Sequence, residues 1–312
     1  MLTMTNKTPH IPVLLEQSVN ALITNPDGIY IDATFGAGGH SSAILQKISS
    51  KAKLVAFDAD PTAVEFNIQK PNFILFISNY IYIRNFLMLL NIQYVDGIIA
   101  DLGISSMHID RPERGFSFKY NAPLDMRFNP KTPISAKDIV NSYSEQQLTY
   151  LFKNYAQLPN AHKFAKAIVN ARQNKPIQTT FDLVNAIEHL IPQKIRNKTL
   201  AQLFQAIRIE TNNELDNVKK LLLIGKQILK PGGRFVIISF HSLEDRLVKN
   251  FFKTGTFDGN PQKDIYGNFY PPFKPLNKKV ITPSDEELKK NPRAKSAKLR
   301  IAYKLNYNGQ NN

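Results

Sequence analysis

Hydrophobic residues in the first hundred positions follow two alternating periodicities. Short apolar runs have the length and composition of buried strands, and the segments between them carry apolar residues at helical spacing. The runs lie at 29–33, 54–57, 73–77 and 98–100, and helices are expected through Ala43–Leu45, from Pro61 and near Phe86–Met88. Strands that alternate with helices in this way predict a doubly wound, mostly parallel α/β sheet.

The pattern changes after residue 101 and is almost wholly helical from Ile134 to Leu203. Ser135 and Ser144 are followed three residues later by Asp138 and Gln147, as in capping boxes. The apolar residues Phe164, Ala167, Ile168 and Ala171 recur at helical spacing, which is typical of packing. This region therefore predicts an all-α insertion.

The α/β pattern then resumes. A helix after Glu214 is expected to run to Lys230 and to end at Pro231–Gly233, and a buried strand follows at 234–239. Residues 297–303 alternate as a late strand with one solvated face, and 261–292 read as a surface loop. We expect an α/β core at 1–112 and 206–312, interrupted by a helical insertion at 113–205.

The turn after the first apolar run indicates a ligand site. The run ends at Asp32 and opens into a turn with Gly36, Gly38 and Gly39. Glycines allow positive φ and close approach of the backbone to a ligand, and the next helix points its N–H groups into the same space. The G-x-G-x-x-G fingerprint is not met, because Ser41 replaces the third glycine, and the phosphate-loop lysine is missing. The remaining pattern, D-x-x-x-G-x-G, resembles the first motif of S-adenosylmethionine-dependent methyltransferases.

Two more strands end in acids, Asp58 and Asp101. Asp58 stands at about the spacing at which α/β nucleotide sites place the acid that binds ribose hydroxyls, and ligands of such sheets bind outside the carboxyl ends of the strands. Aspartate is also common after strands as a turn former or helix cap, and for each residue alone that explanation is equally good. The three acids together, beside the glycine turn, favour a cofactor site.

Composition narrows the class of protein. The 312 residues are 43% hydrophobic, contain no cysteine, and include six histidines without metal-ligand spacing. Disulfides, thiolate zinc sites, iron–sulfur clusters and thiol nucleophiles are therefore excluded, and no metal site is expected. No apolar run approaches the ~20 residues that a membrane span needs, and the N-terminus lacks a signal-peptide core. We expect a cytoplasmic protein without membrane contact.

The net charge suggests a polyanionic partner. Forty Lys and Arg against 25 Asp and Glu give a formal charge of +15. Basic residues outnumber acidic ones 11 to 4 between Lys131 and Arg208, and 10 to 3 between Pro271 and Lys304. On charge alone, a solvated basic surface explains this excess as well as nucleic-acid binding does.

Several long motifs occur in order along the chain. They are HIPVLLEQSV at His10, GIYIDATFGAGGH at Gly28, VDGIIADLGISS at Val95, RGFSF at Arg114, PLDMR at Pro123, FQAIRIETNNELD at Phe204, PGGRFVIISFHSLEDRLVK at Pro231 and NPRAKSAKLR at Asn291. Together they resemble the bacterial ribosomal RNA small subunit methyltransferase H family over residues 10 to about 303. Two segments depart from the family pattern, at 155–158 and 200–203, and both lie in the helical insertion.

The resemblance implies a Rossmann-like methyltransferase core, S-adenosyl-L-methionine as cofactor, and the N4 amine of a cytidine in the decoding region of 16S ribosomal RNA as target. The RNA partner would be met in the small ribosomal subunit or its late precursor. The cofactor-binding candidates are Asp32, Gly36, Gly38, Gly39, His40, Asp58, Tyr80, Asp101 and His108. Tyr80 stands where the family usually has Phe, and His108 where it usually has Gln.

Methyl transfer from a sulfonium is an in-line displacement, in which the enzyme mainly positions the amine and excludes water. The cytosine amine shares its lone pair with the ring, so an acceptor on its N–H would localise that pair and later take the proton. Asp101 is the candidate, with Ser105 and Ser106 just beyond it. A helix cap or a turn explains the two serines equally well.

The RNA-binding candidates are aromatic or charged side chains. Phe116 and Phe118 could hold an extruded base, although core packing is the commoner role of phenylalanine. His241, Glu244, Asp245 and Arg246 follow the strand that ends at Ser239 and are expected at the same rim. The complete set is Arg114, Phe116, Phe118, Arg127, His241, Arg246, Arg293, Lys295, Lys298 and Arg300.

Two other functions fit part of the sequence. One is a methyltransferase that acts on protein or on a small metabolite, against which the basic surface and the motifs argue. The other is an RNA-binding assembly factor without catalysis, against which the intact acids Asp32, Asp58 and Asp101 argue. A cofactor titration would separate this second alternative from an enzyme.

Overall fold

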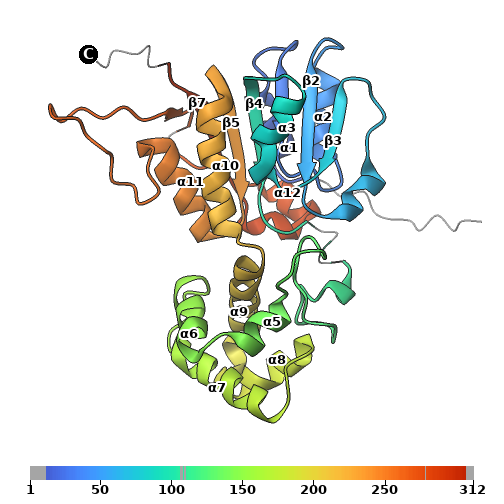
Figure 1. Ribbon diagram of the computed structural model, residues 1–312, viewed down its shortest axis with the longest axis vertical. Helices are drawn as coiled ribbons and strands as arrows, with labels where there is room; N and C mark the ends of the chain where they lie inside the picture. Colours follow the sequence, from blue (N-terminus) through green and yellow to red (C-terminus); the bar gives the residue numbers. More distant parts are fainter. Residues whose placement is uncertain (1–11, 106–107, 109, 278, 307–312) are drawn as a thin grey trace, which may run out of the picture. The chain divides into compact units, whose positions relative to one another are not determined.

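The computed structural model describes residues 12–105, 108, 110–277 and 279–306, and the chain divides into two compact units (Figure 1). Unit 1 comprises Met1–Gly103 and Asn217–Asn312, and unit 2 comprises Ile104–Asp216. The sequence pattern places the boundaries at 112–113 and 205–206. Asn212 shows why the second boundary lies later, because its side chain accepts from Phe128 N (2.7 Å) and donates to Met126 O (2.8 Å), both in unit 2.

Unit 1 contains a seven-stranded sheet in the order β3-β2-β1-β4-β5-β7-β6. Strands β1 to β5 pair in parallel, whereas β7 is antiparallel to both β5 and β6. The strands are β1 (Ile29–Asp32), β2 (Lys53–Asp58), β3 (Phe73–Ile77), β4 (Val95–Asp101), β5 (Leu229–Ser239), β6 (Phe273–Pro275) and β7 (Lys298–Lys304). The expected doubly wound, mostly parallel fold is confirmed.

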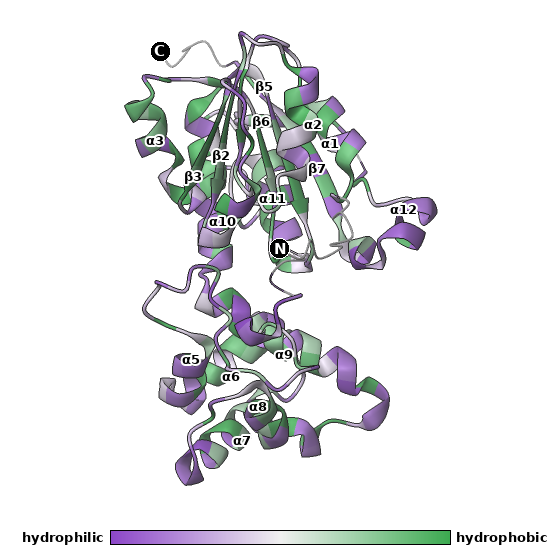
Figure 2. Ribbon diagram, turned by 90° about the vertical axis from the view of Figure 1, so that its right-hand side faces the viewer, coloured by the Kyte–Doolittle hydropathy of each residue, from purple (hydrophilic) through white to green (hydrophobic). Residues whose placement is uncertain are grey.

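Helices cover both faces of this sheet. Helices α3 (Ile83–Leu89), α10 (Glu214–Ile228) and α11 (Ser242–Thr254) pack in one apolar cluster with strand residues such as Ile98 and Ile237. Helices α1 (Leu15–Leu22) and α2 (Gly39–Lys47) pack in a second cluster with the adjacent strand residues Ile99 and Val236. Because neighbouring strand residues face opposite sides, the central strands are buried on both faces, and the sheet is mostly in the hydrophobic colours of Figure 2.

Unit 2 is helical, as expected for the insertion. Within residues 110–216 its α-helices are α5 (Ala136–Ser142), α6 (Glu145–Asn154), α7 (Ala161–Asn174), α8 (Thr180–Ile187) and α9 (Arg196–Thr211). The capping boxes at Ser135 and Ser144 are both confirmed. In α7, Phe164 and Ile168 are buried and Ala167 packs against the same core. No helix among the described residues of either unit is long and apolar enough to cross a membrane.

The helix predicted from Pro61 is confirmed as a 3₁₀ helix, Pro61–Phe66, with Asp60 as its cap. Two other local predictions were wrong. Helix α10 ends at Ile228, because Leu229 already pairs with Val95 of β4 and residues 231–233 lie within β5 at a register shift. The surface loop predicted at 261–292 contains β6 and helix α12 (Asp285–Lys290). The remaining 3₁₀ helices are Tyr80–Tyr82, Pro112–Arg114, Glu188–Leu190, Gln193–Ile195 and Pro292–Ser296.

Candidate cofactor and catalytic site

The turn after β1 is hydrogen-bonded to the ends of both neighbouring strands. On one side Gly36 N donates to Asp58 Oδ2 at 2.7 Å, where β2 ends. On the other side Asp101 N, at the end of β4, donates to Thr34 Oγ1 at 2.6 Å. These bonds bring the carboxyl ends of three parallel strands, each ending in an aspartate, around one turn of unit 1.

Two glycines shape this turn. Gly36 has φ +57° and a Cβ there would meet nothing closer than 4.0 Å, so the backbone conformation rather than crowding favours glycine. Gly38 has φ +77°, and its Cβ would lie 2.8 Å from the ring of Phe35. Gly38 is also the N-cap residue of α2, which therefore has no side-chain cap. An uncapped helix N-terminus favours an anionic ligand group.

Asp32 is buried beneath the turn, with 1% of its surface exposed. Its carboxylate accepts from Ser41 Oγ at 2.7 Å and from Thr34 N at 3.1 Å. Burial raises the pKa of Asp32 to about 6, against the lowering effect of these two bonds, and the charge of Asp58 raises it further. Asp32 therefore titrates close to neutral pH in the protein without cofactor.

Asp101 is the more perturbed group. Its Oδ1 is buried and has no hydrogen-bond partner within the described part of the chain. Burial raises the pKa of Asp101 well above its ordinary value, and the nearby charges of Asp32 and Glu244 raise it further. Glu244 itself is buried in α11, where its Oε2 accepts from Phe240 N at 3.0 Å. Carboxylates that raise the pKa of a neighbour make this end of the sheet attractive to a cation.

Sequence reasoning missed the residues that hold these acids. Thr34 and Ser41 lie inside the glycine motif but carry no spacing signal of their own, and their roles depend on how the turn folds back. Glu244 was expected at the rim of the site, but not as an influence on Asp101. Because Glu244 and Asp101 lie far apart in sequence, only the fold reveals this pair.

The other candidate cofactor residues divide between the units. His40 is buried in the first turn of α2, Gly39 begins that helix, and Tyr80 is partly buried after β3, all in unit 1. His108 belongs to unit 2, where its Nδ1 lies 3.1 Å from Ser105 Oγ. Ser106 lies outside the described residues. The cofactor roles of these side chains remain predictions.

His108 belongs to an aromatic cluster that the sequence did not predict. Its ring centroid lies 5.1 Å from that of Phe116 and 5.1 Å from that of Phe128. Phe118 packs edge-on against Phe204 at 5.6 Å, within the core of unit 2. Both phenylalanines of the RGFSF turn thus have packing partners, which is the commoner role of this residue type.

Several basic candidates for RNA binding have internal partners. Arg114 donates to Arg127 O and Phe128 O at 2.8 and 2.9 Å, and Arg127 forms a two-bond pair with Asp125. In unit 1, Arg300 Nε donates to Asp245 Oδ1 at 2.6 Å. These bonds support the local structure whether or not RNA is bound.

The last five candidates lie in unit 1. Lys298 Nζ lies 3.4 Å from Asp245 Oδ2, and His241 caps α11 through its Nδ1. Arg246 of α11, together with Arg293 and Lys295 before β7, is exposed. Arg246 and Lys295 are more exposed than Lys298, which pairs with Asp245, and are thus better placed to meet a polyanion.

The strand order, the glycine turn and the strand-end acids are the features expected of a cofactor site in a methyltransferase. The chain belongs to the MraW methylase family, whose family model matches residues 7–305. The methyltransferase class predicted from the sequence is thereby confirmed, and S-adenosyl-L-methionine is the methyl donor expected of it.

Two relatives illustrate the similarity. The chain is 51% identical over 296 residues to the ribosomal RNA small subunit methyltransferase H of Flavobacterium johnsoniae, with 95% of this chain and 98% of the relative covered. It is 50% identical over 295 residues to the protein of the same name from Cytophaga hutchinsonii, with 94% and 98% covered. Among solved structures, an rRNA methylase from Streptococcus thermophilus is similar at a TM-score of 0.36 and 14% identity, with 93% of each chain covered.

Proposed function

We propose that the protein methylates small-subunit ribosomal RNA and transfers the methyl group of S-adenosyl-L-methionine to N4 of a cytidine in the decoding region of 16S RNA. The observation that carries the proposal is the convergence of Asp32, Asp58 and Asp101 on one glycine turn. The names of the relatives support ribosomal RNA of the small subunit as the substrate class.

The chemistry of the turn fits this cofactor. S-adenosyl-L-methionine carries two cationic groups, a carboxylate, a ribose and an adenine, and when bound it supplies an electrophilic methyl group. Asp32 and Asp101 favour the cationic part because a positive ligand relieves their mutual repulsion. The uncapped start of α2 suits the carboxylate, Asp58 suits the ribose hydroxyls, and Tyr80 suits the adenine ring.

Asp101 is proposed to accept the proton that the amine loses. An ordinary aspartate is a weak base. The raised pKa of Asp101 makes its ionised carboxylate a stronger proton acceptor. Its Oδ1 has no other bond to break among the described residues before it accepts an N–H. Alignment on that N–H would localise the amine lone pair. Ser105 and Ser106 remain secondary candidates for contact with the amine.

Unit 2 and the exposed cations of unit 1 are proposed to hold the RNA. Phosphate contacts position an RNA without reading its sequence, and side chains such as Arg246, Arg293 and Lys295 suit that role. The two segments that depart from the family pattern touch each other, since Gln202 Nε2 donates to Ala156 O at 3.1 Å. We infer that they form a local variation in unit 2. The proposed place of action is the cytoplasm, on the small subunit or its late precursor.

Mass mapping of 16S RNA nucleosides tests the proposal. RNA from cells without this protein should lack one N4-methyl group on a decoding-region cytidine, and the wild-type chain should restore it. The Asp101→Asn variant should restore much less, because an amide cannot take the proton. An unchanged methylation map in the deletion would rule out this substrate, whereas loss of a methyl group elsewhere in the RNA would redirect the assignment to that site.

A further inference from the structure

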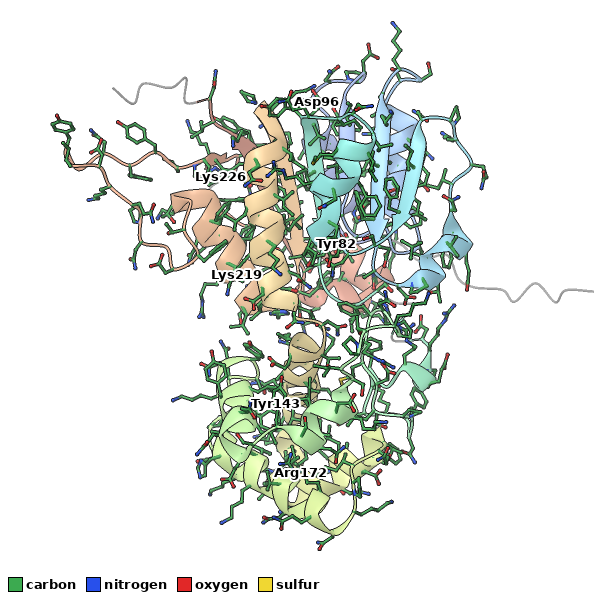
Figure 3. The ribbon with its side chains drawn as sticks, in the orientation of Figure 1. Tyr82, Asp96, Tyr143, Arg172, Lys219 and Lys226 are labelled. Atoms are coloured by element: carbon green, nitrogen blue, oxygen red, sulfur yellow. The ribbon has the colours of Figure 1, made fainter. Side chains whose placement is uncertain are left out.

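The charged side chains exposed by the helices on one face of the unit 1 sheet are mostly basic. Figure 3 labels Lys219 and Lys226, which lie at two levels along α10. Among the described residues of α3, α10 and α11, the one exposed acid is Asp216 in the first turn of α10. Glu214 of α10 and Glu244 and Asp245 of α11 are buried. The basic residues of these helices are Arg84, Lys219, Lys220, Lys226, Arg246, Lys249 and Lys253.

The helices on the opposite face carry both signs. There the exposed acids Glu16 of α1 and Asp285 of α12 accompany exposed lysines such as Lys47 of α2. The exposed charges are therefore mixed on one side of the sheet and mostly basic on the other. General solubility needs no such asymmetry, since interspersed charges serve it equally well.

Helix stability does not account for the basic side either. Lys226 and Lys253 lie in the last turns of their helices, where the macrodipole favours a cation. Arg246, Lys249 and Lys253 are spaced by three and four residues, so they form one stripe roughly 10 Å long on α11. Like charges at this spacing oppose helix formation by a few tenths of a kcal/mol per pair. The macrodipole gain at Lys253 is of similar size, so the stripe brings the helix no clear net stabilisation.

We propose that this surface, which we call the basic face (Lys219, Lys220, Lys226, Arg246, Lys249 and Lys253), binds the phosphate backbone of the ribosomal RNA substrate. The inference rests on the proposed function and adds to it an RNA-binding surface on the helices of unit 1. Tyr82, which leads into α3 and is 52% exposed, gives the same side of the sheet an aromatic ring that a base can stack on.

The type of cation distinguishes RNA from an acidic protein as the partner. Protein interfaces are depleted in lysine and enriched in arginine and aromatic residues. Four of the six residues of the basic face are exposed lysines, namely Lys220, Lys226, Lys249 and Lys253. Lysine is a point charge on a flexible stem, which suits phosphates along an irregular backbone and releases counterions when it binds them.

The test compares two matched variants of the full chain. One replaces Lys220, Lys226, Lys249 and Lys253 by glutamine, and the control replaces Lys47, Lys51, Lys289 and Lys290, which are also exposed and include three lysines in last helical turns. Affinity for 16S RNA transcript is measured against salt. The basic-face variant should flatten the log–log slope by roughly 0.7–0.9 for each phosphate that is no longer neutralised, and the control should match wild type.

Each other outcome has a definite meaning. Equal flattening in both variants would overturn the proposal, because removal of any four charges would then suffice. An unchanged slope together with impaired binding to ribosomal proteins would also overturn it and assign the face to a protein partner. Methylation of small subunits is measured in parallel. Wild-type enzyme that fails to methylate them refutes the proposed function, whereas the slopes still report on the basic face.

Discussion

At the residue scale, three aspartates at equivalent strand ends have different surroundings. Asp32 is buried and accepts from a hydroxyl and a backbone N–H. Asp58 accepts from the backbone N–H groups of Gly36 and Asp60 at 2.7 and 2.8 Å. Asp101 keeps one oxygen without a partner within the described residues. Position in the fold makes them neighbours, but these bonds favour a binding role for Asp58 and a chemical one for Asp101.

For Asp58, the expected result of Asp58→Ala is a loss of about 1.5–3 kcal/mol in S-adenosyl-L-methionine binding, the scale of hydrogen bonds to a charged group. Calorimetry measures it. The exposed Asp285→Ala on α12 serves as the control and should bind normally. Because Asp58 also accepts from Gly36 N, circular dichroism must show a retained fold. An unchanged dissociation constant would remove Asp58 from the ribose site.

Asp101→Asn separates chemistry from binding. The amide keeps the shape of the carboxylate but cannot accept a proton, so the single-turnover methylation rate should fall more than the affinity for cofactor or RNA does. Exchange of Asp32 for Asn is the matched comparison in the same carboxylate cluster, and it should alter cofactor affinity more than the rate. A variant at Asp101 that loses only cofactor affinity would contradict the proton-acceptor role.

The buried Asp32 predicts a pH dependence of stability. Its pKa is about 6 in the fold and near 3.8 when unfolded, so between these values the folded state holds a proton that the unfolded state has lost. The cofactor-free protein should therefore lose stability as pH rises from about 4 to about 6, by roughly 3 kcal/mol from this residue. The raised pKa of Asp101 acts in the same direction. Urea unfolding at about pH 4.5 and about pH 7 should show that Asp32→Asn removes this loss, and parallel curves for both proteins would refute it.

At the element scale, α11 and β7 are joined by one buried acid. Burial alone would raise the pKa of Asp245, but the hydrogen bond and charge of Arg300 and the charge of Lys298 outweigh it and lower the pKa. This stabilisation is present above the ordinary aspartate pKa and is lost as pH falls through the lowered value. The ion pairs of Asp245 with Arg300 and Lys298 thus join α11 to β7.

Two double variants separate this structural role from RNA binding. Lys298→Ala with Arg300→Ala should lower the free energy of unfolding at neutral pH by roughly 1.5–3 kcal/mol or more, because Asp245 keeps a buried charge without these partners. Arg246→Ala with Lys295→Ala should leave stability almost unchanged and flatten the salt dependence of RNA affinity. The reverse pattern would return Lys298 and Arg300 to the RNA-binding set.

A helix or strand can be predicted from the sequence when the contacts that stabilise it are local along the chain. The parallel strands and the capped helices at Ser135 and Ser144 depend on local periodicity and local bonds, so they could be predicted. Helix α12 had a usable signal, since Ser284 caps Glu287 N three residues on, but the carboxylate of Glu287 also binds Leu14 N from the other end of the chain. The end of α10 and the β6 strand depend on pairing with distant strands, which no local pattern encodes.

The same division applies to the site. The acids Asp32, Asp58 and Asp101 could be found because each ends an apolar run. The orphaned oxygen of Asp101, the neighbourhood of Glu244 and the pairing of Arg300 with Asp245 follow only from packing. The sequence therefore predicted where the candidate site lies. The structure showed which of the predicted residues, such as Arg300, already pair with other side chains.

At the scale of the whole molecule, the cofactor candidates lie in unit 1 with one exception, His108. Hydrogen exchange of the full chain, with and without S-adenosyl-L-methionine, tests this distribution. Ordering of a ligand-binding turn raises the protection of its amides. Protection should therefore rise at 32–40, at 58–60 and at 101–103, while the core of α7 and α9 in unit 2 stays unchanged.

His108 makes the same experiment decisive for the second unit. Cofactor binding at His108 would also protect the amides of 110–116, beside the ring cluster of His108 with Phe116. If the rise in amide protection on cofactor binding is confined to unit 1, His108 belongs instead to the aromatic packing of unit 2. His108→Ala with unchanged cofactor affinity but a lower unfolding temperature would support that packing role, and the exposed His162→Ala controls for the loss of an imidazole.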